Sequence, residues 1–151
     1  MGTGFHGGFG DTFGSKVVIL SPTFAGDENN LKIAAKWIKP KSGYTDIVIH
    51  GTPDYALIKI GNDWVEINHR VLARMYKGDK GYSKNSIRLI SCETGRNVGG
   101  FAQNLTNKLG RKVIAPSDMV WIHPSGKMTI GPNAWSNTGK WISYRPKKGD
   151  N

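Results

Sequence analysis

Two reactive side chains stand directly after apolar runs of the kind that form buried strands. The run Ile47–Ile49 is followed by His50 and Gly51, and the run Ile87–Ile90 is followed closely by Cys92, the single cysteine of the chain. Ligands bind at the carboxyl ends of the strands in open α/β sheets, so neighbouring parallel strands would bring the thiol and the imidazole together. A thiol beside an imidazole is the minimal equipment for nucleophilic catalysis.

The residue types predict a role for each part of such a site. A cysteine thiol is mostly protonated at neutral pH, and His50 is expected to accept its proton. The backbone N–H groups of Gly51 and Cys92 are expected to hold the oxyanion of a tetrahedral intermediate. The absence of a side chain at Gly51 also allows close approach of the backbone to a ligand.

Three further residues support the predicted site. Ser91 is a small neighbour that keeps the approach to the sulfur open, and it is too embedded in the strand pattern to be the better nucleophile. Glu93 and Asp54 either orient His50 or contact a substrate, with solvated loop charges as the alternative interpretation. His123 lies in a Pro-Ser-Gly turn and is expected at the surface.

Strands and helices alternate along the chain, which predicts an α/β fold with a mostly parallel central sheet flanked by helices. Its strands are expected near residues 17–20, 46–50, 87–91 and 113–115, with a last strand at 141–144. Helices are expected at residues 28–38, after the capping residue Asn68, and from Asn97 or Gly99 to a stop at Gly110. Alternating patterns predict hairpins within residues 55–67 and 119–130, the second as a C-terminal extension. We expect a flexible Gly-rich segment at 1–15 and a single domain at 16–151.

Composition limits the possible partners. The 151 residues carry 21 Lys and Arg against 11 Asp and Glu, a net charge of +10, which favours an acidic protein or a nucleic acid as partner. One cysteine excludes an internal disulfide framework. No metal or other cofactor is expected, because the four histidines never recur at i, i+4; they are His6, His50, His69 and His123. No apolar run approaches the roughly 20 residues of a membrane span, and the start lacks a signal-peptide pattern.

The two strand ends resemble those of the caspase-like (clan CD) cysteine peptidases, over roughly residues 17 to 115. This group includes caspases, gingipains, clostripain and the self-cleaving domains of large bacterial toxins. The resemblance implies a caspase-like fold, with His50 as the acid and base, the Gly51 amide in the oxyanion hole and Cys92 as the nucleophile. No acidic pocket for a particular substrate side chain is recognisable.

A second resemblance concerns the C-terminal half, and it is carried by the segments 87–95, 100–105, 113–116 and 120–121. These segments look like the C-terminal toxin domains of bacterial polymorphic toxins, including Rhs-repeat and contact-dependent toxins. That resemblance implies a toxin tip released from a larger secreted carrier, active in the cytoplasm of the target cell and neutralised by an acidic cognate immunity protein.

Together these features predict a toxin domain that acts on a protein of the target cell as a Cys-His cysteine protease or a related thiol-dependent acyl-transfer enzyme. Two alternatives remain open at this stage. One is a basic nuclease or nucleic-acid-binding toxin, and the other is a non-enzymatic binding domain on a peptidase-like scaffold.

Overall fold

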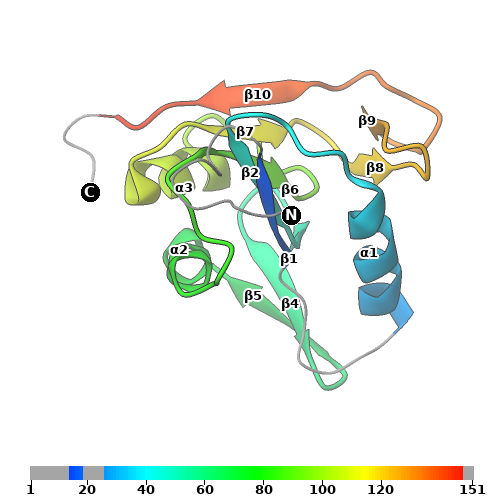
Figure 1. Cartoon of the computed structure of the whole chain (residues 1–151), viewed down its shortest axis with the longest axis horizontal. Coiled ribbons are helices and arrows are strands. Elements are labelled where there is room, and N and C mark those ends of the chain that lie inside the picture. The colour runs from blue at the N-terminus through cyan, green and yellow to red at the C-terminus, as the bar shows by residue number, and fades with distance from the viewer. Residues whose placement is uncertain (1–13, 19–25, 148–151) are drawn as a thin grey trace.

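The computed structural model describes residues 14–18 and 26–147, which form a central sheet with helices on both faces (Figure 1). The predicted flexible segment at 1–15 therefore lies almost entirely outside the described residues. So does the second half of the strand predicted at 17–20. Side chains are described from Leu31 onward in the first helix.

The central sheet has five strands in the order β1-β2-β6-β7-β10. Their bounds are β1 (Ser15–Val18), β2 (Tyr44–Val48), β6 (Ser86–Ile90), β7 (Val113–Pro116) and β10 (Trp141–Tyr144). The first four are mutually parallel, and β10 runs antiparallel to β7. The mostly parallel sheet is thus confirmed, and its antiparallel member is the last strand.

Two small antiparallel sheets adjoin the central one. The first joins β3 (His50–Gly51), β4 (Ala56–Ile60) and β5 (Asp63–Ile67), and the second joins β8 (Val120–Ile122) and β9 (Met128–Ile130). Both predicted hairpins are confirmed. The late hairpin forms a sheet of its own and does not extend the central sheet.

The strands of the central sheet bury both of their faces. Ile47 and Leu89 contribute to the core under α2 (His69–Lys77) and α3 (Phe101–Leu109). Val48 and Ile90 belong to a second core with α1 (Gly26–Trp37) and the β8–β9 hairpin. Successive side chains of a strand point to opposite faces, so strands covered on both sides have continuous apolar runs. Figure 1 shows α1 on one side of the sheet and α2 with α3 on the other.

The helix ends follow from capping chemistry, with one difference from the prediction. Asn68 caps α2, since its side-chain oxygen accepts from the Val71 N–H at 3.0 Å. Gly110 ends α3 in the left-handed conformation, at φ 72°. However, α3 begins at Phe101 and not at residue 97 or 99, because residues 97–100 form a turn in which the Gly100 N–H donates to the Asn97 carbonyl.

A buried ion pair joins β2 to β6. Asp46 and Arg88 are register partners, and they are only 1% and 9% exposed. The guanidinium donates to both carboxylate oxygens, at 2.6 and 2.7 Å, and also to the Lys39 carbonyl at 2.8 Å. Burial raises the pKa of Asp46, and the hydrogen bonds and charge of Arg88 oppose that rise. The pair is thus fully desolvated and bidentate, the geometry in which an arginine-carboxylate contact is most specific.

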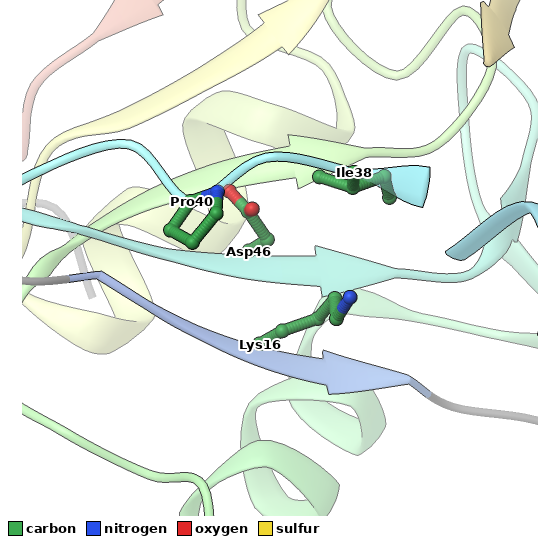
Figure 2. A pocket seen from close by; sticks show the side chains of 4 residues that line it. All are labelled: Lys16, Ile38, Pro40 and Asp46. Carbon is green, nitrogen blue, oxygen red and sulfur yellow. The ribbon is translucent and has the colours of Figure 1, made fainter. Parts of the chain in front are cut away.

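Asp46 also lines a small depression of about 70 Å³ on the α1 side of the sheet. Figure 2 shows it between Lys16 of β1 and the segment that holds Ile38 and Pro40. The Lys16 ammonium donates to the Ala35 carbonyl at 2.5 Å, and its charge lowers the pKa of Asp46. The depression is too small for a drug-sized ligand, whose pockets hold several hundred Å³.

Removing one member of the buried pair should be more damaging than removing both. We expect Arg88→Met to lower the free energy of unfolding by about 3–5 kcal/mol, because it leaves the Asp46 carboxylate buried without its partner. The double variant Asp46→Leu, Arg88→Met should recover most of that loss. Urea denaturation followed by circular dichroism measures both. A double variant no more stable than Arg88→Met would contradict this account.

Candidate thiol site at the carboxyl ends of β2 and β6

The register of the central sheet brings the two predicted strand ends together. Val48 and Ile90 are the last register partners of β2 and β6, and the Ile49 N–H still donates to the Ile90 carbonyl at 3.2 Å. His50 stands two residues after Val48, and Cys92 stands two residues after Ile90. Both residues thus follow the carboxyl ends of neighbouring parallel strands, at the edge of the sheet where a ligand site is expected.

Gly51 packs directly against the segment that carries the thiol. A Cβ atom at this position would lie 2.1 Å from Ser91 Oγ, 2.7 Å from the Thr94 methyl carbon and 3.1 Å from the Cys92 carbonyl oxygen. Protein atoms, and not a ligand, therefore make the close approach to Gly51 on the side where a Cβ atom would stand. Glycine is required here so that the two strand ends touch.

Ser91 lies inside this contact. It is 1% exposed, and its hydroxyl finds no hydrogen-bond partner among the described residues. Its carbonyl accepts from the Thr94 hydroxyl at 2.8 Å, which closes the turn after the strand. A buried hydroxyl without access to solvent is poorly placed to attack a substrate, so Cys92 is the better candidate nucleophile of this segment.

The thiol of Cys92 is half-buried and lies beside the first residue of β8. Its sulfur lies 3.9 Å from the Val120 carbonyl oxygen, with which it forms a weak hydrogen bond. Burial raises the pKa of the thiol, a backbone hydrogen bond with Val120 lowers it, and the charges of Glu93 and Asp118 raise it further. The net effect is a higher pKa, so Cys92 is a neutral thiol at neutral pH and needs a base before it can attack.

His50 lies where the chain leaves the central sheet. It pairs with Leu57 of β4, and its ring meets Trp64 of β5 edge-to-face at 5.0 Å between centroids. The Lys59 ammonium lies 5.5 Å from the centroid of the Trp64 ring. The β4–β5 hairpin therefore fixes the orientation of the imidazole. Sequence reasoning did not include Trp64 in the site, because this contact depends on how the hairpin folds back on β3.

The acidic candidates have other partners. Glu93 pairs with Arg96 at 2.8 Å, and Arg96 also pairs with Asp118 at 3.2 Å. Asp54 accepts from the Asn97 amide at 3.2 Å. These described contacts stabilise the loops around the thiol and do not involve His50. Asp118 was missed, although it follows the parallel strand β7 and the rule that found the ends of β2 and β6 also applies to it.

Glu93 has an unusual backbone conformation. Its φ of 64° is the only positive φ at a non-glycine residue among residues 14–18 and 26–147. The left-handed region costs an ordinary residue roughly 1–2 kcal/mol. The Glu93 N–H donates to the Asp118 carbonyl, and the Gly95 N–H donates to the Pro116 carbonyl. The turn directly after the thiol is thus held by the end of β7, and strain of this kind clusters at functional sites.

The other two described histidines, His69 and His123, have different surroundings. His123, expected at the surface, is half-buried, and its Nε2 lies 3.0 Å from the Thr129 hydroxyl. Burial lowers the pKa of His69, as do the charges of Arg70 and Lys108. Within the residues that the structure describes, no group of three His, Cys, Asp or Glu side chains is arranged to hold a metal ion. None of the described helices is long and apolar enough to cross a membrane.

Comparison with known proteins adds a family but no activity. Residues 18–130 match the family described as Domain of unknown function (DUF8616). The match covers more than half of the chain, so the chain belongs to this family. No curated protein and no solved structure matches it. The functional argument therefore depends on the residues of the site.

The raised pKa of Cys92 predicts the pH dependence of its reactivity. We expect the rate of alkylation by iodoacetamide in the folded protein to keep rising from pH 6 to beyond pH 9, because the thiolate fraction grows until the pH passes the raised pKa. Mass spectrometry of quenched samples measures the rate. A plateau near neutral pH would show instead a thiolate already stabilised by a positive neighbour.

The contact at Gly51 predicts a large effect of one methyl group. Gly51→Ala should lower the free energy of unfolding by about 1–3 kcal/mol, because the new Cβ overlaps Ser91 Oγ and the Thr94 methyl carbon. Gly61→Ala is not a clean control, since Gly61 has a positive φ. Gly78→Ala is a suitable one, because the nearest atom to its Cβ would be 3.5 Å away. Thermal unfolding compares them, and equal melting temperatures would contradict the contact.

Proposed function

We propose that this domain is a thiol-dependent hydrolase in which Cys92 attacks a carbonyl carbon and His50 moves the proton. The observation that carries the proposal is that β2 and β6 are parallel neighbours whose last register partners, Val48 and Ile90, lie two residues before His50 and Cys92. The direct contact of Gly51 with the segment of the thiol supports it independently.

The proposed reaction uses the Cys92 thiol, the His50 imidazole, the amides of Gly51 and Cys92, and water. His50 takes the thiol proton as the sulfur forms a bond to the carbonyl carbon, and the carbonyl oxygen becomes an oxyanion held by the amides of Gly51 and Cys92. His50 then gives the proton to the leaving amine as the C–N bond breaks, which leaves a thioester. Water activated by His50 releases the acid and restores the thiol. The raised pKa of Cys92 favours this order, in which deprotonation accompanies attack.

The proposed fold type is caspase-like. One support is the pair of neighbouring parallel strands β2 and β6, which end two residues before His50 and Cys92. The others are the hairpin and helix that connect these strands and the antiparallel strand β10 beside β7. On the resemblance of segments 87–95 and 100–105, we further propose that the domain is the effector of a polymorphic bacterial toxin. Its target would be a protein of the recipient cell, and its inhibitor an acidic immunity protein.

Comparison of new protein termini tests the reaction class. Purified wild-type protein and Cys92→Ala are incubated with a bacterial cytosolic extract, and N-terminal peptides are enriched and sequenced by mass spectrometry. We expect new termini with the wild type and none with Cys92→Ala, since the variant lacks the nucleophile. His50→Ala should reduce their rate of appearance by about 10²–10⁴-fold, the usual contribution of a general acid and base.

His123→Ala is the matched control, because it removes another half-buried imidazole, whose Nε2 contacts the Thr129 hydroxyl of β9. It should leave the cleavage pattern and its rate unchanged. Circular dichroism establishes that each variant is folded. Equal cleavage by wild type and folded Cys92→Ala would overturn the thiol mechanism, and an absence of new termini with active, toxic wild type would overturn proteolysis.

A further inference from the structure

Cations gather at the edge of the central sheet opposite the thiol site. Tyr44, the first residue of β2, has the Lys41 ammonium 5.3 Å and the Lys112 ammonium 5.5 Å from its ring centroid. Lys112 directly precedes β7, and its carbonyl accepts from the Ile87 N–H at 2.9 Å. Two lysines from different segments thus converge on one aromatic ring at the amino ends of the strands.

A second aromatic ring on this edge has the same surroundings. The Arg111 guanidinium lies 5.2 Å from the centroid of Tyr82 and donates to its hydroxyl at 2.7 Å. That hydrogen bond lowers the pKa of Tyr82 although burial raises it, and the charges of Arg111, Lys84 and Lys77 lower it further. A tyrosine whose ionised form is favoured lies in a region of positive potential.

The two groups lie at the same end of the central sheet, at the starts of β2, β6 and β7. Arg111 and Lys112 are consecutive in sequence, and the hydroxyls of Thr45 and Ser83 lie 2.7 Å apart between the two rings' segments. We call this surface the basic edge and define it by five cations and two rings: Lys41, Lys77, Lys84, Arg111, Lys112, Tyr44 and Tyr82.

No ion pair among the described residues includes a cation of the basic edge, although the charge of Lys41 lowers the pKa of Asp46. The ion pairs found among residues 14–18 and 26–147 are Asp46–Arg88 and the pairs of Arg96, none of which includes a cation of this edge. Asp79 is in the same loop region, and its carboxylate accepts from the Gly81 N–H at 2.7 Å. The positive charge is therefore available to a ligand.

Two acidic side chains, those of Glu93 and Asp118, lie at the other end of the same strands. Ser86 to Cys92 spans six residue steps, or about 20 Å in an extended strand. Glu93 and Asp118 are close enough to Cys92 to raise the pKa of its thiol. Arg96, a cation of the loops beside the thiol, pairs with both of these carboxylates, so a polyanion is attracted to the basic edge and would be a bound partner there.

We propose that the basic edge binds the sugar-phosphate backbone of a nucleic acid, at a site separate from the thiol. The cations stand at the starts of the neighbouring strands β2, β6 and β7, which are about 4.8 Å apart, so they form a row that suits a linear polyanion. An acidic protein or a membrane would need apolar anchors. The exposed large hydrophobic residues of the described chain all lie off this edge: Ile33, Ile60, Trp64, Val65, Val98 and Trp135.

Fluorescence anisotropy with a labelled 20-nucleotide single-stranded DNA tests this proposal on the full chain. Five phosphate contacts predict that affinity falls about 100-fold between 50 and 200 mM salt. The double charge reversal Lys41→Glu, Lys84→Glu should weaken binding at least about tenfold at 50 mM salt. Cys92→Ala should bind as the wild type does, so the result is independent of the proposed hydrolase activity.

The matched control is Lys127→Glu, Lys140→Glu, which changes the net charge equally at exposed lysines near the β8–β9 hairpin. It should leave the affinity within about threefold of the wild type. Equal losses in the two double variants would overturn the basic edge as the site. Tighter binding of polyglutamate or of phosphatidylglycerol vesicles at matched charge would overturn nucleic acid as its occupant.

Discussion

The bidentate pair of Asp46 and Arg88 is the constraint on which the arrangement of this molecule depends. The two residues face each other across β2 and β6 with almost no exposure to solvent. A one-residue slip of a strand would turn every side chain to the opposite face and leave two buried charges unpaired. The pair therefore fixes the register four residues before the thiol, and this register decides that His50 and Cys92 reach the same edge of the sheet.

Much of this arrangement could be predicted from the sequence, because it depends on local patterns. The apolar runs before His50 and Cys92 are typical of strands covered on both faces, and the structure covers them with α1 on one side and α2 with α3 on the other. The sequence does not predict the contacts that form where the chain leaves the central sheet after β2 and β3 pairs with β4. The packing of Trp64 on His50 and of Gly51 on Ser91 has no local sequence signal.

The surroundings of Cys92 favour one kind of thiol chemistry. Cysteines that react as stable thiolates lie beside cations or helix N-termini. Here burial and two carboxylates raise the pKa of the thiol, and α3 begins at Phe101, after the turn of residues 97–100. The start of α3 thus lies further along the chain from Cys92 than the start predicted at Asn97 or Gly99. A base that acts during the attack then becomes necessary, and the orientation of His50 by Trp64 gains importance.

The separation of charge along the strands gives the two ends of the sheet different chemistry. The net charge of +10 by itself suggests a uniformly basic surface, but Glu93 and Asp118 lie close to the thiol, each paired with Arg96, while cations collect around Tyr44 and Tyr82. Such a polar distribution orients a molecule in the field of a polyanion. With its basic edge on the polyanion, the chain would present the carboxyl ends of β2 and β6 to the opposite side. The excess of lysine and arginine therefore need not indicate a nuclease, because the cations of the basic edge lie at the opposite end of the strands from the proposed thiol site.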